Sequence, residues 1–176
     1  MQWLSQVAVV TSLAVAVGCS VPKRPDGGTG LLAVGSPVPK VTGVDQSGKE
    51  HSLADLGGKP TVVYFYPKDG TPGCTKEACA FRDVWNKYEA AGVLVFGVSR
   101  DTRESHEKFA VKHSLDFPLI ADPQGTWADA FGVGRTAGLY HRVTFLVGRD
   151  GKIAKVYPNV DPGVHAGQVL QDVKAL

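Results

Sequence analysis

Two cysteines five residues apart, Cys74 and Cys79, are the side chains of this sequence best suited to redox or nucleophilic chemistry. The thiolate form of cysteine is the nucleophile. It is favoured in the first turn of a helix, where backbone N–H groups lack internal partners and the macrodipole is positive. Two Pro and two Gly lie between Pro67 and Gly73, and residues with helical spacing follow Cys74. The sequence therefore predicts a nucleophilic thiol where a tight loop becomes a helix.

The segments on either side of this loop have clear patterns. Residues 61–66 are a continuous β-branched and aromatic run, which predicts a strand buried on both faces. Residues 75–91 repeat apolar side chains at helical spacing, which predicts a single helix. The expected unit is a strand, a loop and a helix, with Cys74 at the start of the helix.

Pro67, Thr71 and Cys74 fit the pattern Pro-x-x-x-Thr-x-x-Cys, which resembles the active-site motif of the peroxiredoxins. The second cysteine, Cys79, resembles the bacterioferritin-comigratory-protein (PrxQ) subfamily, the thioredoxin-dependent thiol peroxidases. The likeness extends from about Leu32 to the C-terminus. It includes three further runs, Tyr64-Phe65-Tyr66-Pro67-Lys68, Phe81-Arg82-Asp83 and His141-Arg142-Val143-Thr144-Phe145-Leu146.

The resemblance implies a role for each of five residues. Cys74 would be the peroxidatic thiolate that attacks a hydroperoxide, Thr71 would donate a hydrogen bond to the reacting oxygens, and Pro67 would shield the thiolate from water. Arg142 would hold the sulfur as thiolate and bind the peroxide, because a guanidinium keeps its proton. Cys79 would resolve the Cys74 sulfenic acid as a disulfide, which a thioredoxin-like reductant recycles. Neither a cofactor nor a metal is implied.

A helix keeps the two cysteines apart. Five residues along a helix separate two Cα atoms by about 8–9 Å on different faces, whereas a disulfide needs less than about 7 Å. We therefore expect the helix to unwind from Cys74 to about Phe81 when the enzyme is oxidised. The alternative is a cycle that uses only Cys74, with Cys79 in the core. Lys76 and Glu77 are expected on a solvated face of the same helix.

Composition limits the function classes. The chain has 176 residues, of which 43% are hydrophobic and 20% charged, so one domain with a packed core is expected. A net charge of +2 without a basic stripe excludes a nucleic-acid-binding footprint. Three cysteines give no disulfide framework. His51, His106, His113 and His165 show no metal-ligand spacing, and no phosphate loop or serine-nucleophile motif is present.

The N-terminus predicts export. Residues 7–18 form an uncharged, mostly apolar run that is too short to span a bilayer and suits a signal-peptide core. The run ends Ala16-Val17-Gly18-Cys19, which resembles a bacterial lipoprotein cleavage box. We expect residues 1–19 to be a signal segment, with Cys19 as the site of lipid attachment. An ordinary signal peptide and a mis-assigned start codon are the alternatives, because no Lys or Arg precedes the run.

The segments after the signal set the expected location and partners. Residues 20–31 mix Pro and Gly with polar residues and are expected to form a flexible tether before the peroxiredoxin domain of residues 32–176. The expected location is the bacterial cell envelope, as a periplasm-facing lipoprotein, with the cytoplasm as the alternative. An exported thioredoxin-like protein would then be the reductant, since cytosolic thioredoxin cannot reach it. The resemblance implies a monomer.

The order of elements predicts an α/β fold. Strands are expected at residues 41–44, 61–66, 93–99, 117–120, 143–147 and 153–157, a further short element at 51–56, and helices at 75–91, 102–113, 124–131 and 162–176. Asp150-Gly151 predicts a hairpin between the last two strands. This order predicts a central mixed sheet with helices on both faces, which resembles the thioredoxin fold. Phe109 and Val111 are expected as the main apolar contacts of the 102–113 helix.

Two other classes of exported thioredoxin-fold protein are alternatives. Thiol–disulfide oxidoreductases use Cys-x-x-Cys, and Sco-type copper chaperones combine Cys-x-x-x-Cys with a distant histidine, for which His141 or His165 is available. The spacing here is Cys-x-x-x-x-Cys, and neither class explains a threonine three residues before the first cysteine. The pattern favours the peroxidase.

Overall fold

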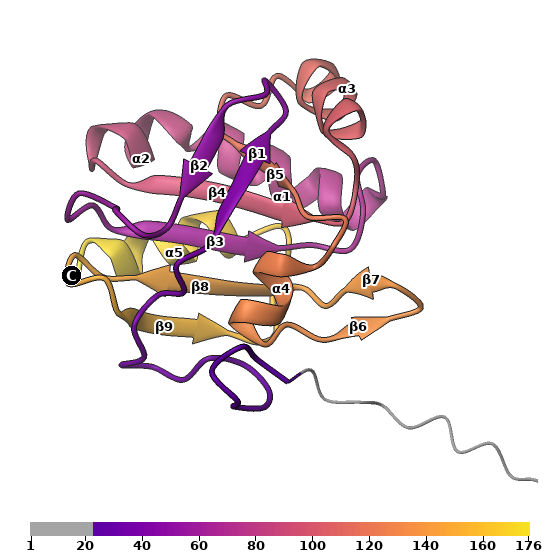
Figure 1. Ribbon diagram of the computed structural model, residues 1–176. Helices are drawn as coiled ribbons and strands as arrows, with labels where there is room; N and C mark the ends of the chain where they lie inside the picture. Colours follow the sequence, from indigo (N-terminus) through magenta and orange to yellow (C-terminus); the bar gives the residue numbers. More distant parts are fainter. Residues whose placement is uncertain (1–22) are drawn as a thin grey trace, which may run out of the picture.

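The computed structural model describes residues 23–176, so the predicted signal segment and Cys19 lie outside the described residues. A seven-stranded mixed sheet forms the centre of the molecule (Figure 1). In spatial order its strands are β2 (Glu50–Ser52), β1 (Thr42–Asp45), β5 (Leu119–Ala121), β4 (Leu94–Ser99), β3 (Thr61–Phe65), β8 (Val143–Val147) and β9 (Ile153–Tyr157). β3, β4 and β5 are parallel, and the other neighbours are antiparallel. Every residue of β3 is buried, as the β-branched and aromatic run at 61–66 predicts, and every residue of β8 is buried as well.

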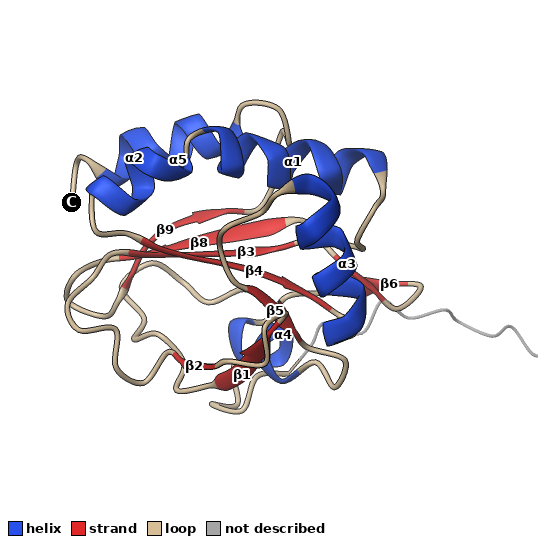
Figure 2. Cartoon of the chain, turned by 90° about the horizontal axis from the view of Figure 1, so that it is seen from above, coloured by secondary structure: helices blue, strands red, loops and turns tan. Residues whose placement is uncertain are grey.

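Helices cover both faces of the sheet. Figure 2 shows α1 (Pro72–Asp83), α2 (Trp85–Ala90) and α5 (His165–Val173) over one face and α4 (Thr126–Phe131) against the other. α3 (Arg103–His113) adds Phe109 and Ala110 to the core under α1 and α5. α4 covers the second core with Trp127 and Phe131. The predicted α/β, thioredoxin-like architecture, a mixed sheet between helices, is confirmed.

The predicted 75–91 helix is wrong in one respect, because the chain breaks it at Val84. The backbone of Val84 has φ −117° and ψ 11°, which ends α1 and starts α2. No Pro or Gly marks the break. The bend accompanies the burial of Tyr88, whose hydroxyl donates to the Ala166 carbonyl of α5 at 2.7 Å. A tertiary contact therefore accompanies a boundary that the local pattern does not show.

Two smaller expectations also differ from the structure. Val111 is 77% exposed, and α3 instead buries His106, Phe109 and Ala110, which share one helix face. A short hairpin, β6 (Arg135–Thr136) and β7 (Leu139–Tyr140), has no counterpart in the sequence prediction. Its turn places Ala137 at φ 51°. Because alanine is a poor residue for positive φ, the sequence carries only a weak turn signal there.

Residues 23–31, the described part of the predicted tether, form a closed turn beside α4. Lys23 pairs with Thr29, and Arg24 Nη1 donates to the Gly30 carbonyl at 2.8 Å. The Leu32 N–H donates to the Phe131 carbonyl at 3.0 Å, which fixes the end of the segment. The tether assigned to residues 20–31 stays a prediction. Within residues 23–176, no helix combines the length and apolarity needed to cross a bilayer.

Candidate active site

The loop after β3 places Cys74 in the first turn of α1. Thr71 is the N-cap, with an extended backbone at φ −74° and ψ 148°, and Pro72 begins the helix, where its missing N–H costs nothing. The first helical bond runs from the Thr75 N–H to the Thr71 carbonyl at 2.9 Å. Cys74 is a free thiol and is 2% exposed. It lies at the positive end of the helix macrodipole, which favours its thiolate.

Arg142 reaches Cys74 from the other end of the chain. It directly precedes β8, whose Val143 pairs with Phe65 at the end of β3, so Arg142 lies at the end of the sheet from which the loop to Cys74 leaves. Arg142 Nη2 donates to Cys74 Sγ at 3.2 Å. Burial alone would lower the pKa of Arg142, but the charge of Glu77 and the contact with Cys74 raise it above its ordinary value. The sulfur is therefore beside a permanent cation.

Glu77 is buried, and its expected place on a solvated helix face is wrong. Its side chain is 0% exposed, and Arg142 Nη1 donates to its Oε2. Within the described chain, its Oε1 has no hydrogen-bond partner. Burial raises the pKa of Glu77 to about 7, although Arg142 opposes the rise. The sequence carried one indication that Glu77 belongs to the site: it is three residues after Cys74 and hence on the same helix face.

Thr71 and Pro67 occupy the loop that leads to Cys74. The Thr71 hydroxyl donates to the Lys68 carbonyl at 3.0 Å, so it braces the loop in this state. Its donation to a peroxide stays a prediction. Pro67 and Arg142 line a hollow of about 510 Å³. The structure thus brings Pro67, Thr71, Cys74 and Arg142 to one region.

Cys79 lies half-buried on α1 with a free thiol. Since α1 is helical from Pro72 to Asp83, the two sulfurs project from different faces and the Cα atoms are about 8–9 Å apart. The structure therefore shows the dithiol arrangement. A disulfide between these residues stays a prediction.

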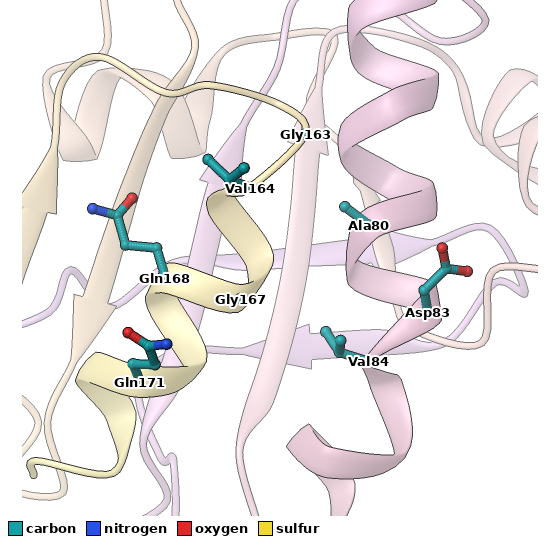
Figure 3. A pocket seen from close by; sticks show the side chains of 8 residues that line it. All are labelled: Ala80, Asp83, Val84, Gly163, Val164, Gly167, Gln168 and Gln171. Atoms are coloured by element: carbon teal, nitrogen blue, oxygen red, sulfur yellow. The ribbon is translucent and has the colours of Figure 1, made fainter.

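A groove of about 570 Å³ lies between the C-terminal half of α1 and α5 (Figure 3). Small residues leave room for it: Ala80 lies on α1, Gly163 just before α5, and Gly167 on α5. Its other lining residues are Asp83, Val84, Val164, Gln168 and Gln171. The end of α1 that follows Cys79 is thus incompletely covered.

His165, to which the sequence assigned no role, is buried against β8, the strand that Arg142 directly precedes. Its Nε2 lies 2.8 Å from Oγ1 of Thr144, two residues after Arg142. Burial lowers the pKa of His165 to about 4, so the ring is neutral at pH 7. Within residues 23–176, no three His, Cys, Asp or Glu side chains gather in a way that could hold a metal ion.

A buried thiol at a helix N-terminus, held by an arginine on a thioredoxin-like sheet, defines a thiol-based oxidoreductase. Residues 34–156 match the AhpC/TSA family. Over 146 residues the chain is 41% identical to a bcp peroxiredoxin of Coxiella burnetii, covering 79% of this chain and 97% of that one. Over 165 residues it is 40% identical to the chloroplastic peroxiredoxin Q of Sedum lineare, covering 89% and 86%.

Solved structures agree with the sequence relatives. Peroxidoxin BcpB from Mycobacterium tuberculosis superposes with a TM-score of 0.76 at 35% identity, covering 82% of this chain and 98% of that one. Peroxiredoxin Q from Xanthomonas campestris superposes with a TM-score of 0.75 at 32% identity, covering 81% and 97%. The chain therefore belongs to the AhpC/TSA family and is a peroxiredoxin of the PrxQ type, a thiol peroxidase. This assignment decides against the disulfide oxidoreductase and the copper chaperone.

Proposed function

We propose that this peroxiredoxin reduces hydrogen peroxide and organic hydroperoxides with Cys74, resolves the product with Cys79, and is recycled by a thioredoxin-like reductant. The observation that carries the proposal is the 3.2 Å contact between Arg142 Nη2 and Cys74 Sγ. A cation in that place stabilises the thiolate before the reaction and the oxygen charge that develops during it.

The first step oxidises the sulfur. The Cys74 thiolate attacks the terminal oxygen of a hydroperoxide, so an S–O bond forms while the O–O bond breaks. The other oxygen takes one proton and leaves as water or an alcohol, and Cys74 becomes a sulfenic acid. Thr71 would turn its hydroxyl from the Lys68 carbonyl toward the peroxide. Pro67 lines the hollow beside Arg142, where the peroxide would bind.

The hollow beside Arg142 supports organic hydroperoxides as substrates. Its volume is about 510 Å³, larger than hydrogen peroxide needs. Pro67, Pro158 and Val160 contribute apolar groups to its lining, and Arg142 contributes a cation. An alkyl group would contact these apolar groups while its peroxide oxygens reach the guanidinium.

The second step joins the two cysteines. The Cys79 thiol attacks the sulfur of the Cys74 sulfenic acid, a disulfide forms and water leaves. Because the helical Cα separation exceeds the disulfide limit, α1 must unwind first. The groove between α1 and α5 supports this motion, since Ala80 and Val84, which line it, are only partly buried. The alternative is a one-cysteine cycle, in which an external thiol attacks the sulfenic acid.

Rapid mixing tests the first step. The reduced chain is mixed with hydrogen peroxide while tryptophan fluorescence, to which Trp85 at the start of α2 contributes, is followed. We expect a reaction far faster than that of a free thiol, and its loss in Cys74→Ser. A wild-type rate no faster than a simple thiol would show that Thr71 and Arg142 do not activate Cys74.

Amide exchange tests the second step. In the oxidised wild type we expect lost protection across α1, while Cys79→Ser, treated with the same peroxide, keeps its helix. Equal protection of α1 in reduced and oxidised wild type would leave only the one-cysteine cycle. Mass spectrometry of the Cys74–Cys79 peptide pair provides the matching covalent readout.

The lipoprotein assignment belongs to the same proposal. It is supported by the apolar run at residues 7–18 followed directly by Cys19. We expect labelled palmitate to enter the full-length chain and not Cys19→Ser, and the protein to fractionate with the cell envelope as a monomer. A full-length protein found only in the cytosol would contradict this, and cytosolic thioredoxin would then be the reductant.

A further inference from the structure

The loop that carries Pro67 and Thr71 is anchored by a buried pair of side chains, Asp69 and His106. His106, on α3, is 0% exposed, and its Nδ1 lies 2.9 Å from Oδ2 of Asp69. Asp69 lies two residues after Pro67 and two before Thr71, and its side chain is 7% exposed. The pair therefore joins the middle of the active-site loop to a helix that has no other part in the chemistry.

Both ring nitrogens of His106 have hydrogen-bond partners. Nδ1 faces the Asp69 carboxylate, and Nε2 lies 3.2 Å from the Ile120 carbonyl on β5. A neutral imidazole donates from one nitrogen only. The Tyr66 hydroxyl also lies 3.3 Å from Nδ1. Because the Asp69 carboxylate and the Ile120 carbonyl are both acceptors, both ring nitrogens are placed to donate.

The carboxylate is satisfied as an anion. Its Oδ1 accepts from the Tyr66 hydroxyl at 2.8 Å, and its Oδ2 accepts from Ser105 Oγ at 2.8 Å as well as from His106. Burial opposes the ionisation of Asp69, but these hydrogen bonds and the charge of His106 hold its pKa below the ordinary value. Burial also raises the pKa of Tyr66, so its hydroxyl keeps its proton.

The backbone of the loop is fixed at the same residue. The Asp69 N–H donates to Oδ2 of Asp101, in the segment between β4 and α3, at 2.9 Å, and Ser99 Oγ donates to the same oxygen at 2.7 Å. Both the main chain and the side chain of Asp69 are thus anchored. Pro67 and Thr71 each lie two residues from this anchor.

We infer that the His106–Asp69 pair is a positioning device for the peroxide-binding loop, and that peroxidase activity falls when this pair is broken. Without His106, the Asp69 carboxylate keeps only its hydrogen bonds from Tyr66 and Ser105. The loop then loses its charged anchor, while Arg142, Glu77 and the first turn of α1 stay in place. This inference rests on the proposed peroxidase function of Cys74.

The test compares His106→Asn with Ser105→Ala in the full-length chain kept in mild detergent. Asparagine offers one donor and cannot carry a charge, whereas Ser105→Ala removes a neutral hydrogen bond to the same Asp69 oxygen. At pH 7 we expect the rate constant with hydrogen peroxide to fall about 10–100-fold in His106→Asn, the cost of displacing reacting groups by up to about 1 Å. Ser105→Ala should lose less than about fivefold, in keeping with one neutral hydrogen bond.

The alkylation of Cys74 separates positioning from mere folding. Alkylation by iodoacetamide, which does not use the loop, should have the same rate in all three proteins. A His106→Asn variant that slows alkylation and peroxide reduction by the same factor, or an unchanged peroxide rate, would overturn the inference.

A measurement on the wild type is independent of variants and of activity. Long-range ¹⁵N–¹H correlation spectra at pH 7 should show both His106 nitrogens protonated. A neutral tautomer would contradict the inference even if Cys74 is a fast peroxidase. Conversely, a slow wild-type Cys74 beside a charged His106 would contradict the proposed function and leave the ion pair standing.

Discussion

Replacing Glu77 by glutamine is expected to change how the stability of the reduced protein depends on pH. Glutamine has nearly the same shape and still accepts the hydrogen bond from Arg142, but it does not titrate. Glu77 is fully buried, and Arg142 is the only charged partner that the described chain gives it. The variant therefore removes one proton-binding group and little else.

The magnitude follows from the pKa. Burial raises the pKa of Glu77 from 4.5 to about 7. The unfolded chain releases this proton near pH 4.5 and the folded protein near pH 7, so between these values the folded state binds more protons. Stability must then fall as pH rises. At 1.36 kcal/mol for each pH unit, the loss amounts to about 3 kcal/mol once the pH passes 7.

Urea unfolding at several pH values between 4 and 8, with both cysteines reduced, measures this effect. The unfolding free energy of Glu77→Gln minus that of the wild type should increase by about 3 kcal/mol across the range. Buried His165 changes stability in the opposite direction over part of this range, but equally in both proteins, so the difference isolates Glu77. A difference that stays flat with pH would refute the reasoning, because it would mean that Arg142 cancels the effect of burial on the pKa of Glu77.

Three further substitutions address the rest of the site. Arg142→Lys should lower the rate constant with hydrogen peroxide about 10²-fold by stopped-flow fluorescence, because an ammonium cannot span Cys74 and Glu77 as a planar fork does; an unchanged rate would show that charge alone suffices. Val160→Phe should slow the reaction with cumene hydroperoxide about tenfold and the reaction with hydrogen peroxide little, because phenylalanine fills the hollow. Equal slowing of the two reactions would place the alkyl group elsewhere. His165, whose pKa burial lowers from 6.5 to about 4, costs the wild type up to about 3 kcal/mol as pH falls through that range. In urea unfolding at pH 4.5 and 7, His165→Asn should lack this loss, and a persistent acid loss would assign it to another group.

The parts of the fold that the sequence predicts well are those encoded locally. The apolar run at 61–66 specifies a buried central strand because both of its faces are covered, and β3 has that environment. The Pro-Gly loop specifies where α1 begins, and Cys74 lies within its first turn. Each of these conclusions needs only a few neighbouring residues. The resemblance to the peroxiredoxins added Arg142, which no local pattern could have connected to Cys74.

The parts that the sequence could not predict depend on contacts between distant segments. Glu77 looks like a surface residue of a helix until the strand pairing brings Arg142 over it. His106 lies in a charged helix, and only the packing of α3 against the active-site loop shows that it faces Asp69. The same reason explains Val84, where burial of Tyr88 against α5 accompanies a helix break without Pro or Gly.

One guanidinium in this site serves two acids. Arg142 donates to Cys74 Sγ through Nη2 and to Glu77 Oε2 through Nη1. If both were ionised, the buried site would hold two negative charges against one positive charge. The desolvated carboxyl, with Oε1 unpartnered in the described chain, is the group that burial drives toward its neutral form. A neutral Glu77 leaves the whole charge of Arg142 to its other partner, so burying this carboxyl directs the guanidinium to the Cys74 sulfur.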